Sequence, residues 1–150
     1  VWNFDVNTKR DGWAMSKSLA NAKISGGVLT ADVINRKPFF VTEEANLGID
    51  TSNYDKVSFC IRNATPSTLA KVYFITKESP AWSEDKCVEV SVEKNDALHM
   101  AYTADMSSNP AWSGTLKGLR IELTGIDDFD EAMQIGLDFV KVLKNLPAKQ

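Results

Sequence analysis

The side chains best suited to bind a ligand fall on the polar positions of short segments in which apolar and polar residues alternate. Val72 and Phe74 take the apolar positions around Tyr73, so we expect the Tyr73 ring on the opposite face. The cations in similar positions are Arg62, Lys71 and Arg120. An aromatic ring beside hydrogen-bond donors suits a sugar, which presents apolar C–H faces and many hydroxyls. Arginine could also hold a uronate or sulfate group through two parallel hydrogen bonds.

Acidic residues share these polar positions and leave a second interpretation open. Glu89 and Glu122 alternate with apolar residues of their own segments. The same positions could therefore form an exposed sheet face with cross-strand ion pairs, each of which contributes little stability. Three cations on one face favour ligand binding, and we include Glu89 among the candidate binding residues.

Four tryptophans divide between expected core positions and loops. Trp2 and Trp13 lie where the alternation requires buried residues, whereas Trp82 and Trp112 each follow a Pro-Ala pair in a loop. Each loop tryptophan could stack on a sugar ring or close one end of a hydrophobic core. Both remain candidates for binding.

Residue patterns typical of catalysis are weak. His99 is the one histidine, and it has no serine or cysteine nucleophile motif around it, so we expect a surface histidine. No glycine-rich phosphate loop is present, and no carboxylate pair can be singled out for glycoside hydrolysis. Cys60 and Cys87 fit no metal-binding spacing and could be bonded or free. We therefore predict that the chain is not an enzyme.

Composition limits the possible partners. The chain has 150 residues, of which 43% are hydrophobic and 25% charged, as in one globular domain. The net charge of −3 gives no reason to expect nucleic acid or an anionic membrane as a partner. No apolar run is long enough to insert into a bilayer.

Alternation also predicts the elements that must position these residues. Strands are expected at 2–6, 29–33, 39–41, 57–62, 71–75, 87–92, 99–104, 119–123 and 133–143. We interpret 57–62 and 71–75 as a hairpin, which would bring Arg62, Lys71 and Tyr73 together. Pro38 favours a sheet edge or a break, and the shifted phase around Asp138 indicates a bulge. Many short strands without helical periodicity predict an all-β antiparallel β-sandwich or barrel.

The order of several motifs resembles that of bacterial jelly-roll carbohydrate-binding modules. The opening motifs are Trp2–Asp5, Gly12-Trp13 and Gly26–Leu29. Later motifs are Ile61–Thr65, Val72–Phe74, Trp112–Leu116, Leu119–Ile121 and Ile135–Val140, and the tryptophan Trp82 before a strand. The resemblance implies a jelly roll over residues 1–143, followed by a polar linker at 144–150.

The same resemblance implies a function and a metal. Such modules are usually appended to secreted glycoside hydrolases or polysaccharide lyases, so we expect a polysaccharide ligand, a catalytic domain in the same parent chain and an extracellular or cell-surface location. We expect a monomer. Asp5 and Asp138 match family positions that help bind a structural calcium ion, which needs additional oxygen ligands.

Two alternatives stay open. The sandwich could be a spacer or protein-interaction domain of a surface protein without a sugar site, or a small lyase or hydrolase. Sandwich folds host all three functions, so the fold by itself does not choose among them.

Overall fold

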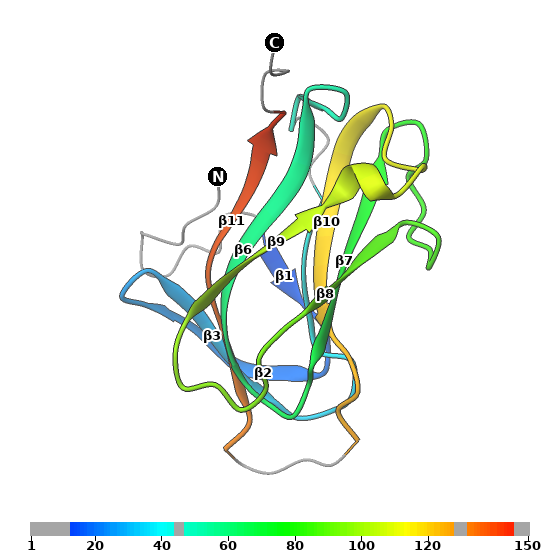
Figure 1. Ribbon diagram of the computed structural model, residues 1–150. Coiled ribbons are helices and arrows are strands. Elements are labelled where there is room, and N and C mark those ends of the chain that lie inside the picture. The colour runs from blue at the N-terminus through cyan, green and yellow to red at the C-terminus, as the bar shows by residue number, and fades with distance from the viewer. Residues whose placement is uncertain (1–12, 44–46, 128–131, 146–150) are drawn as a thin grey trace.

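Two antiparallel sheets pack face to face in the computed structural model (Figure 1), which describes residues 13–43, 47–127 and 132–145. In the described residues, the smaller sheet has the order β2 (Leu19–Ser25), β3 (Val28–Val33), β11 (Gln134–Lys144), β6 (Tyr54–Ala64) and β9 (Met100–Asp105). The larger sheet has the order β1 (Trp13–Met15), β4 (Phe39–Glu43), β10 (Thr115–Leu123), β7 (Leu69–Thr76) and β8 (Cys87–Ser91), with β5 (Ile49–Asp50) also paired to β10. A short 3₁₀ turn, η1 (Met106–Ser108), follows β9.

This architecture confirms the predicted all-β sandwich, and its core lies between the sheets. Alternate side chains of each strand point inward, among them the fully buried Phe59 and Phe74. Burying one such side chain stabilises the fold by roughly 1.5–3 kcal/mol. Trp13 belongs to this core, as predicted, with 3% of its surface exposed. Trp2 lies outside the described residues.

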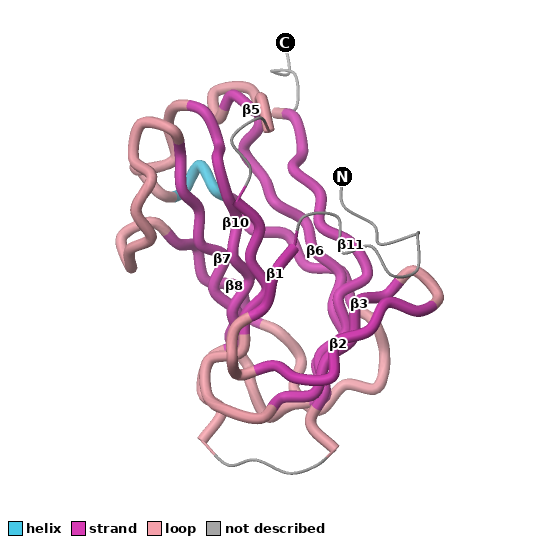
Figure 2. The backbone as a smooth tube through the Cα atoms, turned by 180° about the vertical axis from the view of Figure 1, so that it is seen from behind, coloured by secondary structure: helices cyan, strands magenta, loops and turns pink. Residues whose placement is uncertain are grey.

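The predicted hairpin is wrong, because β6 and β7 belong to different sheets. The connection between them crosses the sandwich and is fixed by the buried Asn63, whose Nδ2 donates to the carbonyls of Ser67 (2.8 Å) and Glu93 (2.9 Å). Arg62 therefore lies on one sheet, and Lys71 and Tyr73 lie on the other. Figure 2 shows the two layers from behind.

Two further details differ from the expectation. The strand β2 was missed because Asn21 adopts φ 54° and the β2–β3 register shifts between Ala20 and Lys23, which breaks the alternation. Pro38 precedes β4, so its missing N–H does not prevent β4 from lying between β1 and β10 instead of at an edge. The bulge near Asp138 is confirmed by the register shift between Leu137 and Phe139.

The two cysteines are free thiols. Cys60 lies on β6 and Cys87 on β8, in different sheets. Burial raises the pKa of both thiols, which lowers their reactivity. In the described part of the chain, no helix is long and apolar enough to cross a membrane.

Candidate functional site

Four of the predicted binding residues gather on the outer face of the larger sheet. Arg120 is opposite Tyr73 across β10 and β7, and Lys71 is opposite Glu89 across β7 and β8. The alternation placed these residues on the correct face. Arg62 does not join them, because β6 is in the smaller sheet.

The cations of this group are paired with neighbouring carboxylates. Lys71 Nζ lies 3.1 Å from Glu84 Oε2, and the Tyr73 hydroxyl donates to Glu84 Oε1 at 2.8 Å. These contacts lower the pKa of Glu84, the Tyr73 hydrogen bond contributing most. Arg120 pairs with Glu122. The face therefore resembles the ion-paired sheet surface of our second interpretation.

The aromatic rings predicted as stacking platforms are mostly covered. Tyr73 is 2% exposed, and the Arg120 guanidinium carbon lies 4.6 Å from its ring centre and 4.1 Å from that of Phe39. Trp112 is 8% exposed, contacts Phe74 edge-on at 5.0 Å between ring centroids, and donates from Nε1 to the Tyr54 carbonyl. Burial contradicts a stacking role for Tyr73 and Trp112, and Trp112 instead closes the core. Trp82 is half-buried in the β7–β8 loop.

A row of planar polar side chains crosses the outer face of the smaller sheet. Asn21 Nδ2 donates to Asp32 Oδ2 (2.9 Å), and Gln134 Nε2 donates to Asp32 Oδ1 (2.8 Å). At the end of the row, an Arg62 guanidinium N–H donates to Gln134 Oε1 at 2.9 Å. The hydrogen bonds from Asn21 and then Gln134 lower the pKa of Asp32. Four strands thus hold these side chains in fixed orientations.

Arg62 differs from the cations of the larger sheet. Within the described residues it forms no ion pair, and its hydrogen bond goes to the neutral amide of Gln134. The remaining guanidinium N–H groups are therefore available to a ligand. Sequence reasoning singled out Arg62 but missed Asn21, Asp32 and Gln134, because their contact depends on the pairing of distant strands.

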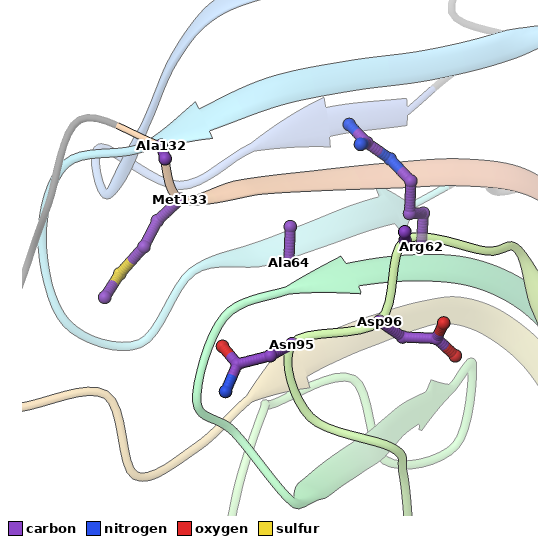
Figure 3. A pocket seen from close by; sticks show the side chains of 7 residues that line it. Arg62, Ala64, Asn95, Asp96, Ala132 and Met133 are labelled. Atoms are coloured by element: carbon purple, nitrogen blue, oxygen red, sulfur yellow. The ribbon is translucent and has the colours of Figure 1, made fainter.

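A cavity of about 290 Å³ opens beside this row (Figure 3). Its walls come from the end of β6, the loop before β9 and the two residues that precede β11. The lining residues are Arg62, Ala64, Asn95, Asp96, Ala97, Ala132 and Met133. The backbone N–H groups of Asn95 and Asp96 donate to the carbonyls of Thr65 and Asn63, both at 2.8 Å. These bonds fix the loop, so the cavity offers charged donors, charged acceptors and an amide at fixed positions.

Gly136 places no side chain on the sheet surface next to Arg62. The two residues are opposite each other across β11 and β6. A methyl group at Gly136 would lie 3.0 Å from Nε2 of His99 and 3.6 Å from Cβ of Arg62. Side chains therefore already fill the space next to Gly136, and the imidazole of His99, exposed as predicted, lies beside Arg62 on this face.

Only one of the two residues predicted to bind calcium lies within the described residues. Asp138 lies half-buried at the β11 bulge, and Asp5 is outside the described residues. In the ranges 13–43, 47–127 and 132–145, no group of three or more His, Cys, Asp or Glu side chains could hold a metal ion. Calcium binding through Asp5 and Asp138 stays a prediction.

Comparison with solved structures supports the fold. No protein-family model matches the sequence, and no curated protein matches it. Among solved structures, the non-crystalline cellulose specific carbohydrate-binding module CBM28 matches with a TM-score of 0.64 and 13% identity, over 95% of this chain and 93% of that chain. The agarase AgWH50C matches with a TM-score of 0.63 and 8% identity, over 95% of this chain and 26% of that chain.

An adhesin domain shares the same architecture. The K1 cleaved adhesin domain of Lys-gingipain from Porphyromonas gingivalis W83 matches with a TM-score of 0.55 and 15% identity, over 95% of this chain and 96% of that chain. At these identities the likeness concerns the fold. The chain has the jelly-roll sandwich of known carbohydrate-binding modules, as the sequence motifs implied.

Proposed function

We propose that the chain is a non-catalytic carbohydrate-binding module. Its ligand is a polysaccharide, held on the outer face of the smaller sheet and in the adjoining cavity. The observation that carries this proposal is the hydrogen-bonded row from Asn21 to Arg62, which ends in a guanidinium group that has no acidic partner among the described residues. The fold shared with carbohydrate-binding modules supports the same function.

The geometry suggests how a sugar would be bound. Arg62 donates hydrogen bonds to ring hydroxyls, and Asp96 and Asn95 accept and donate from the other wall of the cavity. Because the row is already oriented by its own hydrogen bonds, binding immobilises few side chains.

A shallow site of this kind binds weakly by itself, so attachment to a second binding or catalytic unit would raise the effective affinity. The likeness to about a quarter of the agarase chain supports the proposal that this module belongs to a larger secreted enzyme or surface protein.

Removal of the Arg62 side chain tests the site. We expect Arg62→Ala to weaken polysaccharide binding by about tenfold or more, because a hydrogen bond to a charged group contributes roughly 1.5–3 kcal/mol. Affinity gel electrophoresis on a panel of plant, algal and bacterial polysaccharides measures the effect. Arg36→Ala is the matched control, since Arg36 is exposed in the β3–β4 connection. Absence of retardation on every polymer would reject the proposed function.

One observation favours a second candidate function, protein–protein interaction. Leu98 is 68% exposed and Met100 is 40% exposed beside the edge strand β9, and the fold is shared with an adhesin domain. Binding to a glycan that is lost in Arg62→Ala but kept in Leu98→Lys would reject this alternative.

A further inference from the structure

The strand β9 ends the smaller sheet and is paired along one side. Its residues pair with β6 (Figure 1), and no other strand in the described part of the chain pairs with its outer side. A free strand edge presents unpaired N–H and C=O groups, which can bond to a strand of another chain. Proteins usually protect such edges with charged side chains, prolines, bulges, a covering segment or a very short strand.

The edge strands β1, β2 and β8 have this protection, whereas β9 does not. β1 has three residues, and β2 carries Lys23 next to its register shift. β8 carries the exposed Glu89, and the Asn109 side chain donates to two backbone carbonyls near the start of this strand, at 2.9 and 3.0 Å. In β9, Met100–Ala104 contains no charged residue and no proline. The edge of β9 is therefore open to pairing.

The sequence of β9 is complementary to itself in an antiparallel pair. When Tyr102 lies opposite Tyr102 of a second copy, Met100 lies opposite Ala104, so a large side chain meets a small one. One position further out, the imidazole of His99 lies opposite the carboxylate of Asp105, and both residues are exposed in the single chain. A hydrogen-bond donor thus faces an acceptor at each end of the pair.

We propose that the chain forms a two-fold symmetric dimer by antiparallel pairing of β9 with β9 of a second copy, centred on Tyr102. The two smaller sheets join into one continuous sheet, and Met100, 40% exposed in the single chain, becomes covered. Because each copy uses its open edge for the other, the assembly closes at two chains. This proposal replaces the monomer expected from the sequence.

The dimer places two copies of the candidate sugar site on one surface. An axis perpendicular to the joined sheet keeps both outer faces on the same side. Arg62 lies on β6, next to β9, so the strand spacing and the rise per residue put the two Arg62 residues roughly 25 Å apart. One polysaccharide chain that contacts both sites would bind with a higher effective affinity. This consequence rests on the function proposed above, whereas the dimer does not.

Sedimentation velocity of the purified chain without glycan tests the dimer. Between about 10 μM and 1 mM we expect the sedimentation coefficient to rise from the monomer value to the dimer value, as for a weak interface. Ala101 and Thr103, both exposed, face each other across the proposed axis. The variant Ala101→Lys/Thr103→Lys places like charges opposite each other and should raise the dissociation constant by about tenfold or more. The matched variant Ala101→Lys/Thr103→Glu places opposite charges there and should keep the dimer.

The two double variants differ at one exposed residue, so equal melting curves would show that folding does not explain the difference between them. A parent chain that is monomeric at every concentration would overturn the dimer, as would dimers of equal strength in both double variants. A monomeric parent chain that binds a polysaccharide would overturn the dimer and leave the proposed function standing. A dimer that binds no polysaccharide would do the reverse.

Discussion

At the scale of single residues, the Tyr73 hydroxyl lies between two carboxylates. It is 2.8 Å from Glu84 Oε1 and 3.4 Å from Glu122 Oε2. Burial, followed by the hydrogen bond to Glu84, raises the pKa of Tyr73 far above its usual value. A phenolate at this position would be a third negative charge with little access to water.

The raised pKa of Tyr73 predicts a loss of stability in alkali. The folded chain keeps the Tyr73 proton at pH values where the unfolded chain releases it. The stabilisation is therefore complete below pH about 10, the usual tyrosine pKa, and declines as the pH rises above it. Urea unfolding between pH 8 and 11 should show a smaller decline for Tyr73→Phe than for the parent chain.

At the scale of elements, the β6–β7 connection decides which candidate residues meet. The alternation of each strand could be predicted, but it does not indicate which sheet the next strand joins. The path of this connection depends on the buried side chain of Asn63, which donates hydrogen bonds to the backbone of two other segments. The contact between Glu84 and Tyr73 could not be predicted for the same reason. Glu84 lies in a loop, and no local sequence pattern connects it with β7.

Removal of the Asn63 amide is expected to destabilise the fold. Asn63→Ala removes a buried amide and leaves two carbonyls without this donor, that of the buried Ser67 and that of the exposed Glu93. We expect a loss of about 2–4 kcal/mol in the free energy of unfolding, since each unsatisfied buried group costs about 1–3 kcal/mol. Urea denaturation measures the loss. The exposed Asn53→Ala is the control, and an equal effect of both variants would contradict the role of Asn63.

At the scale of the whole molecule, the sandwich could be predicted from the sequence, whereas the face proposed to bind the ligand could not. Alternation in sequences such as Leu119–Leu123 fixes a buried and an exposed side for each strand. The cavity and the row ending in Arg62 form only when β2, β3, β11 and β6 pair. The residues that form the cavity and the row lie far apart in the sequence and share no local motif.

Calcium would act on the stability of the entire sandwich. If Asp138 binds the ion as the family resemblance implies, calcium at 100 times its dissociation constant stabilises the fold by about 2.7 kcal/mol. The melting temperature should then rise with calcium and fall with EDTA, and Asp138→Asn should remove the difference. Identical melting curves in calcium and EDTA would show that no calcium binds.

The position of β11 has a consequence for the order in which the chain folds during synthesis. This strand begins at Gln134 yet lies at the centre of the smaller sheet, between β3 and β6. Until it has left the ribosome, β3 and β6 each present an unpaired edge to the cell. We therefore expect the smaller sheet to close only after translation has passed Lys144, and such long-range pairing favours slow folding.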